Sequence, residues 1–128
     1  MRVVIETLTM HSDARGPVVE PLDAAGLAAQ KNVHVAVSQL GCVRGNHYHQ
    51  IGTEIITVIG PALARFRDGD EIRDVPVAAS EAVRFTIPPG VSHAIKNTGA
   101  QPCTMIAFNT TAHDGNAPDV FRDVLIDS

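Results

Sequence analysis

The feature that most constrains this chain is a pair of histidines, His47 and His49, followed five residues later by Glu54. The run Ile-Ile-Thr-Val-Ile at residues 55–59 comes next, and β-branched residues of this kind favour a strand. Because successive side chains of a strand point to opposite faces, His47 and His49 are predicted to face the same way. Residues 50–53 are long enough for a turn, so Glu54 is predicted to return on the next strand and face both imidazoles.

A second stretch supplies a candidate fourth ligand. Residues 87–97 read Ile-Pro-Pro-Gly-Val-Ser-His-Ala-Ile-Lys-Asn and contain His93. Imidazoles and a carboxylate at one depth form a strong site for a divalent metal. We therefore predict that one metal is bound by His47, His49, Glu54 and His93. We expect zinc, although these ligand types also suit iron, manganese and nickel.

Composition predicts a single small domain over residues 1–128. The chain has four Phe, one Tyr and no Trp, so its core must be built from Val, Ile, Leu and Ala, which favours strands. The net charge is −4 and there is no long basic run. Nucleic acid is therefore not expected as a partner.

The two cysteines, Cys42 and Cys103, are too few for a disulfide framework, and we interpret them as separate reduced thiols. No apolar stretch approaches the ~20 residues of a membrane-spanning helix. Glu6 interrupts the apolar alternation at the N-terminus, which is not typical of a signal peptide. We expect a cytoplasmic location and no membrane partner.

Short strands with a turn signal roughly every ten residues predict an all-β sandwich or barrel. The strand at residues 32–40 alternates, with valines on one face and His34, Ala36 and Ser38 on the other, and it is predicted to be half-buried. The other predicted strands are 2–9, 18–20, 62–67, 71–75, 82–87, 91–96 and 104–109. A loop or single helical turn is predicted in 21–31. The tail at 118–125 has helical spacing, with Asp119 as a possible N-cap.

The two ligand-bearing stretches resemble the paired motifs of the cupin superfamily. In the first motif Gly41, His47, His49 and Glu54 fall in register, while the closing Gly60 comes one residue early. The second motif is matched by Pro88, Gly90, His93 and Asn97, with Ala82 in place of the leading glycine. The resemblance implies a small jelly-roll barrel, or double-stranded β-helix, whose inward His, His, Glu and His hold a metal.

Other motifs are similar to those of sugar-nucleotide enzymes with this fold. The sequence Arg44-Gly45-Asn46-His47 resembles the Arg-Gly-x-His signature of epimerases and isomerases, and Asp13-x-Arg15-Gly16 resembles the opening of the dTDP-4-dehydrorhamnose 3,5-epimerase group. A closer resemblance is to the C-terminal cupin domain of capsular-polysaccharide reductase/epimerases. The shared stretches are 44–49, 62–67, 87–93 and 118–119.

The chain also departs from these families at several points. Gly52 stands where the capsular domains carry a lysine two residues before the ligand glutamate. The rhamnose-type epimerases use a tyrosine acid, and the only tyrosine here is Tyr48, which alternation predicts to point outward. We also expect no counterpart of the reductase domain that accompanies the capsular cupin. The resemblance therefore transfers the fold and leaves the substrate open.

We expect an epimerase or isomerase of a nucleotide-linked keto-sugar, as in polysaccharide or deoxysugar biosynthesis. A metal would stabilise the enolate, and Arg44 would hold the diphosphate, since a guanidinium binds phosphate by bidentate geometry. The proton carrier is left open between His34, Glu54, Lys96 and a water molecule. Arg65 and Arg67 share a strand face and are further candidates for substrate binding, with a solvated outer face as the alternative.

Two other functions fit the same ligands. One is a small Fe(II) cupin dioxygenase, and the other is a non-catalytic sugar- or metabolite-binding cupin. In each case the partner is a small molecule, and we expect the chain to form a homodimer.

Overall fold

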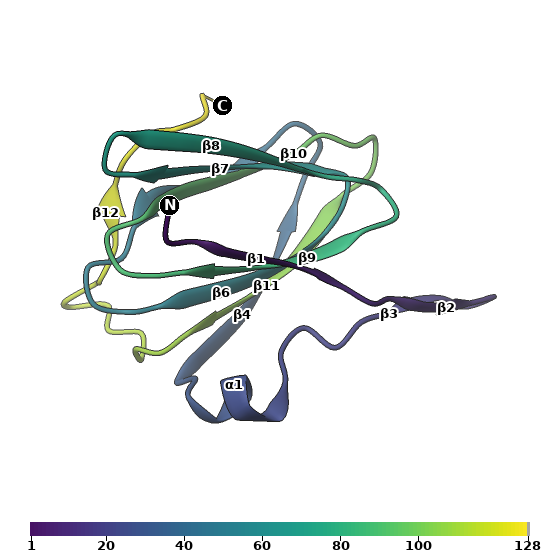
Figure 1. Cartoon of the computed structure of the whole chain (residues 1–128), viewed down its shortest axis with the longest axis horizontal. Helices are drawn as coiled ribbons and strands as arrows, with labels where there is room; N and C mark the ends of the chain where they lie inside the picture. Colours follow the sequence, from purple (N-terminus) through teal and green to yellow (C-terminus); the bar gives the residue numbers. More distant parts are fainter. Residues whose placement is uncertain (128) are drawn as a thin grey trace.

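The computed structural model describes residues 1–127 and consists mainly of two five-stranded antiparallel sheets. Figure 1 shows the sheets as two layers. The first sheet contains, in spatial order, β1 (Val4–Leu8), β9 (Ala82–Ile87), β6 (Glu54–Ile59), β11 (Cys103–Asn109) and β4 (Asn32–Ser38). The second contains β12 (Phe121–Arg122), β5 (Val43–Tyr48), β10 (Ser92–Asn97), β7 (Ala62–Asp68) and β8 (Glu71–Val77).

From β4 to β12 the chain crosses from one sheet to the other at every connection except that between β7 and β8. This connectivity is typical of a jelly-roll barrel and confirms the predicted all-β fold. A short hairpin of β2 (His11–Asp13) and β3 (Gly16–Val18) projects from one end of the first sheet (Figure 1).

The core lies between the two sheets. Phe66 on β7 and Phe85 on β9 are fully buried, and their ring centroids are 5.1 Å apart. Aliphatic side chains from both sheets, including Val58, Ile87 and Ile95, fill the surrounding space. Removal of this apolar surface from water is the main force that holds the sheets together.

A single helical turn, α1 (Ala24–Ala28), lies outside the first sheet, in agreement with the prediction for residues 21–31. The Asp23 carboxylate accepts a hydrogen bond from Gly26 N at 2.7 Å and caps the helix. Leu22, just before the cap, packs against Ile55 and Phe108 on the outer face of the sheet.

The edge strand β4 places its apolar face outward. Val33, Val35 and Val37 are 56%, 63% and 47% exposed, whereas His34 and Ala36, on the other face, line an internal cavity. The alternation was predicted, but the sequence pattern alone favours burial of the valines. The inner face of this strand instead borders the cavity, which small side chains such as that of Ala36 leave open.

The predicted helix at residues 118–125 is wrong. This segment is extended, and Phe121 and Arg122 pair with Tyr48 and His47 of β5. The groups that would cap or build a helix have other partners: the Asp119 carboxylate accepts hydrogen bonds from the backbone of residues 50–52, and the backbone N–H groups of residues 125 and 126 bind Asn46 Oδ1.

Cys42 is exposed, Cys103 is buried, and both are free thiols, as predicted. Within residues 1–127, no helix is long and apolar enough to cross a membrane.

Candidate metal site and cavity

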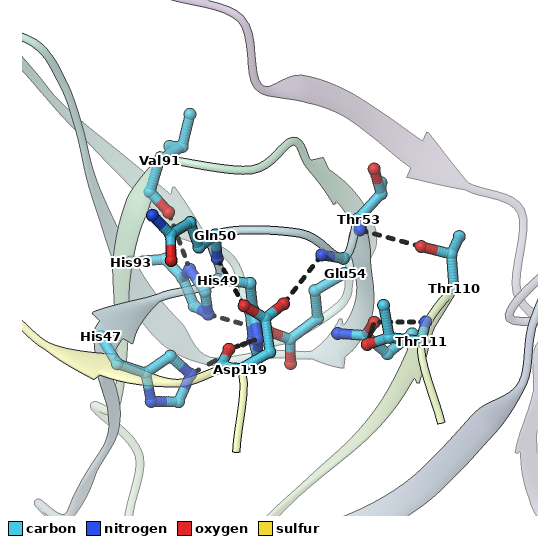
Figure 2. A network of polar contacts seen from close by, with 12 residues as sticks. His47, His49, Gln50, Thr53, Glu54, Val91, His93, Thr110, Thr111 and Asp119 are labelled. Atoms are coloured by element: carbon cyan, nitrogen blue, oxygen red, sulfur yellow. Dashed lines mark hydrogen bonds and ion pairs between the residues drawn. The ribbon is translucent and has the colours of Figure 1, made fainter. Parts of the chain in front are cut away.

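The structure brings the four predicted ligands together from both sheets. His47 lies near the end of β5, His49 follows that strand, and His93 on β10 lies opposite His47 in the strand register, while Glu54 begins β6 in the other sheet. One potential ligand atom from each side chain lies within 4.8 Å of all the others. Figure 2 shows the three imidazoles around the Glu54 carboxylate.

The backbone beside the site has an irregular geometry that requires glycine. Gly45 has φ +92° and Asn46 has φ +57°, and the pairing of β5 with β10 shifts register between His93 and Ala94. A Cβ atom on Gly45 would lie 2.6 Å from the backbone oxygen of His93. The close approach of these two strands sets His47 opposite His93.

Hydrogen bonds to the backbone orient two of the imidazoles. His49 Nδ1 lies 2.7 Å from the carbonyl oxygen of Asp119, and His93 Nδ1 lies 3.2 Å from that of Val91. A carbonyl oxygen can only accept, so in both rings Nδ1 carries the proton. When a ring is neutral its lone pair is then on Nε2, and when it is charged Nε2 carries a second proton. The two Nε2 atoms lie 2.5 and 3.0 Å from Glu54 Oε2.

This arrangement fits a divalent metal. Two Nε2 atoms and a carboxylate oxygen converge, and the hydrogen bond between His49 Nε2 and Glu54 joins two of them. A divalent cation would take the place of the proton in that hydrogen bond. The His93 side chain is 1% exposed and, within residues 1–127, its Nε2 has no hydrogen-bond partner of acceptable geometry, although Glu54 Oε2 is close. His47 Nε2, 4.0 Å from the same oxygen, adds a further donor. The set of three imidazoles and one carboxylate suits zinc, iron, manganese or nickel.

The charges of the cluster are strongly coupled. Burial alone would raise the pKa of Glu54, but the hydrogen bonds and positive charges of His49 and His93 hold that pKa well below its usual range. Burial, reinforced by repulsion from His93, lowers the pKa of His47 to about 4. Burial also acts to lower the pKa of His49, but the hydrogen bonds to Glu54 and to the Asp119 backbone, together with the negative charges of these two residues, outweigh burial and raise the pKa. Glu54 is therefore an anion, and His47 a neutral donor, at neutral pH.

A cavity of about 280 Å³ opens beside the cluster. Three members of the cluster line it, together with His34 and Arg44, whereas His49 does not. Its apolar lining comes from Ile56, Ile95 and Met105 among others. A concave, mostly apolar site with a few convergent polar groups is typical of a small-molecule pocket.

Arg44 lines the cavity, and its guanidinium forms hydrogen bonds with uncharged groups. Its Nε donates to Ser38 Oγ at 3.1 Å and its Nη2 to the Val37 carbonyl at 2.7 Å. Among residues 1–127 it forms no ion pair with a carboxylate. Its positive charge is therefore available to an anionic ligand.

The structure places Arg65 and Arg67 away from the cavity lining. Arg65 Nε lies 2.6 Å from Asp74, and Arg67 Nη1 lies 2.6 Å from Asp123. Each guanidinium group is paired with a carboxylate outside the cavity. This arrangement agrees with the alternative prediction, in which the two arginines lie on the outer face. Lys96 also lies outside the lining.

Tyr48 stacks on Phe121 with ring centroids 5.4 Å apart, so it packs away from the ligands as alternation predicted. Two polar residues near the site, Asp119 and Asn46, were not predicted to contribute to it. The only sequence signal for Asp119 was the shared Pro118-Asp119 pair, which was interpreted as a helix start.

The chain is similar to a known protein family and to several solved structures. A family described as "Polysaccharide biosynthesis C-terminal domain" matches residues 11–121. No curated protein is significantly similar in sequence. Capsular polysaccharide assembling protein CapF from Staphylococcus aureus is 29% identical, with TM-score 0.69, over 92% of this chain and 33% of CapF. The chain thus spans about a third of the length of CapF.

Two smaller proteins are similar along nearly their whole length. A 3,4-ketoisomerase from Helicobacter canadensis has TM-score 0.73 at 13% identity, over 96% of this chain and 92% of that protein. The sugar 3,4-ketoisomerase QdtA from Thermoanaerobacterium thermosaccharolyticum, solved in complex with TDP, has TM-score 0.66 at 17% identity, over 94% and 88%. At such identities the similarity concerns the fold alone, and it confirms the predicted cupin barrel.

Proposed function

The chain belongs to the polysaccharide biosynthesis C-terminal domain family, and on this premise we propose that it is an epimerase or isomerase of a nucleotide-linked keto-sugar. The observation that carries the proposal is the cavity, which is lined by three of the four proposed metal ligands, by a further imidazole, and by a guanidinium that forms no ion pair among residues 1–127. The similarity to CapF and to a ketoisomerase solved with TDP supports this substrate class.

The proposed metal ligands are His47, His49, Glu54 and His93, with zinc the expected ion. When bound, a divalent ion at this position would supply Lewis-acid stabilisation of negative charge beside a substrate carbonyl. The chain's own contribution is to hold the four donors between two sheets, beside the apolar side chains of Ile56, Ile95 and Met105.

We assign the proton transfer to His34. Its side chain lines the cavity from β4, and it is not part of the ligand cluster. Glu54, the other predicted candidate, already contacts the Nε2 atoms of His49 and His93. Histidine is the side chain that most often acts as general acid or base, so it would remove a proton next to the carbonyl and return it.

The first prediction tests the reaction class. A 4-keto sugar nucleotide incubated with the protein in D₂O should gain deuterium next to its carbonyl, with no oxygen consumed, because removal and return of a proton are redox-neutral. His34→Gln should reduce the exchange rate by roughly 10²–10⁴-fold, the usual contribution of a general base, without changing the metal content. Mass spectrometry of the recovered sugar measures both rates.

Other outcomes of this experiment would contradict the proposal. Oxygen uptake with Fe(II) would indicate the dioxygenase. Saturable binding without exchange, across a panel of keto-sugar nucleotides and with the metal site full, would indicate a binding protein.

The second prediction concerns the nucleotide. Arg44→Ala should weaken the binding of TDP by roughly 1.5–3 kcal/mol, the scale for a hydrogen bond to a charged group. Arg73→Ala is a suitable control, since Arg73 is exposed on β8 and lies outside the cavity lining. Isothermal titration calorimetry measures the TDP affinity of both variants. Equal affinities would show that Arg44 does not bind the nucleotide.

A further inference from the structure

We propose that Asp119 is a positioning residue for the metal site, which fixes both the His49 imidazole and the turn that leads to Glu54. The inference builds on the proposed metal site. Asp119 lies in the C-terminal segment, 70 residues from His49 in the sequence, and Figure 2 shows it against the ligand cluster.

The backbone of Asp119 acts on the ring. Its carbonyl oxygen accepts the proton of His49 Nδ1 at 2.7 Å, which fixes the tautomer and directs Nε2 toward Glu54. An outer hydrogen bond of this kind orients a metal-binding histidine and raises its basicity. If the carbonyl moved away, the proton could shift to Nε2, and a protonated Nε2 cannot bind a metal.

The side chain of Asp119 acts on the turn. Its carboxylate accepts hydrogen bonds from the consecutive N–H groups of Gln50, Ile51 and Gly52, at 2.8–3.1 Å. Three convergent backbone N–H groups form a typical site for an anion. This turn joins His49 to Glu54, so the carboxylate fixes the spacing between two of the proposed ligands.

The segment that carries Asp119 is also anchored by contacts that do not involve His49 or residues 50–52. The β12 strand pairs with β5, and Asp123 N donates to the Asn46 carbonyl at 2.8 Å. The Asp123 carboxylate also binds Arg67 and Ser92. These anchors bring Asp119 to the site, but none of them contacts His49 or residues 50–52. A specific role of Asp119 can therefore be separated from a general role of the segment.

The test compares Asp119→Asn with Asp123→Asn. Asparagine at 119 keeps the size of the side chain but places an NH₂ donor against backbone N–H groups, so the turn loses part of its fixation. Asp123→Asn loosens the same segment without altering that turn. The zinc affinity of each metal-free protein is measured by competition with a chromophoric chelator, and circular dichroism follows its fold.

We expect Asp119→Asn to bind zinc roughly 10–100-fold more weakly than the wild type, as is typical when an outer partner of a ligand is lost, and Asp123→Asn to bind almost normally. Equal losses in the two variants would assign a merely structural role and overturn the inference. An unchanged zinc affinity in Asp119→Asn would also overturn the inference, but it would not contradict the proposed metal site. A wild type that binds no zinc would instead overturn the proposed metal site.

A second measurement does not depend on the folding of any variant. Long-range ¹H–¹⁵N NMR spectra of the metal-free wild type, at a pH where the imidazoles are neutral, report which nitrogen of His49 carries the proton. We expect Nδ1–H for His49. A proton on Nε2 would overturn the inference even if the wild type binds zinc.

Discussion

Glu54→Gln is expected to abolish most of the zinc affinity, while the metal-free protein keeps its fold and loses only a modest amount of stability. The carboxylate is the only negative charge among the proposed ligands, and the neutral amide oxygen is a much poorer ligand. Loss of a residue that merely contacts a ligand typically costs 10–100-fold in affinity, so loss of the charged ligand itself should cost more than about 100-fold.

The metal-free protein should lose a smaller amount of stability. In the wild type, the Glu54 carboxylate accepts a hydrogen bond from His49 Nε2, and this contact and the charges of His49 and His93 hold the pKa of Glu54 low. A carboxylate whose pKa is lowered by folding stabilises the folded state at neutral pH. The amide of glutamine keeps a polar partner for His49 but not the charge, so the metal-free melting temperature should fall modestly.

Thermal melts with and without zinc test both expectations. Wild-type protein should melt at a higher temperature with excess zinc, because a ligand that binds only the folded state stabilises it, and Glu54→Gln should lose this increase. Glu81→Gln is the matched control, since Glu81 binds the backbone of Ala78 in the β8–β9 connection, outside the cluster. An unchanged zinc response in Glu54→Gln would exclude Glu54 as a ligand.

The strands and the convergence of the ligands could be predicted because both follow from local periodicity. A two-residue spacing places His47 and His49 on one side of β5, and the turn and the β-branched run return Glu54 toward them. His93 required the second motif, since nothing in local sequence shows that β10 pairs with β5. The resemblance to the cupin superfamily supplied this long-range contact.

The C-terminal segment could not be predicted because its conformation depends on partners distant in the sequence. Its spacing fits a helix, but the Asp119 carboxylate has three backbone donors in residues 50–52, and Asn46 binds the backbone of residues 125 and 126. A short helix gains little from local propensity alone, so these tertiary hydrogen bonds outweigh it. Arg67 is a similar case, because its partner Asp123 is brought close only by this segment.

The glycine at position 52, which stands where the capsular domains carry a lysine, also has a structural explanation. Gly52 is buried, and a Cβ atom there would collide with the Asn109 side chain, while its N–H binds Asp119. This chain therefore uses the backbone at a position where the capsular domains that it resembles carry a lysine. A lysine role in binding or catalysis would have to be filled by another cavity residue, and His34 and Arg44 are the polar side chains that line the cavity outside the ligand cluster.

Gly45→Ala is expected to destabilise the protein by about 2–5 kcal/mol and to weaken zinc binding. A positive φ costs an L-residue about 1–2 kcal/mol, and Gly45 has φ +92°. The added methyl group would lie 2.6 Å from the backbone oxygen of His93, and such overpacking typically costs a further ~1–3 kcal/mol. Relief of this collision requires β5 to move away from β10, which separates His47 from His93.

Gly69→Ala provides the matched control for this prediction. Gly69 also has a positive φ, +62°, but a methyl group added there would meet no atom within 4 Å in its exposed turn. Its substitution should cost only the ~1–2 kcal/mol of backbone strain and leave zinc affinity unchanged. Urea unfolding of the metal-free proteins gives the two free energies, and chelator competition gives the affinities. Equal destabilisation, or normal zinc binding by Gly45→Ala, would show that the close approach of β5 and β10 does not set the distance between His47 and His93.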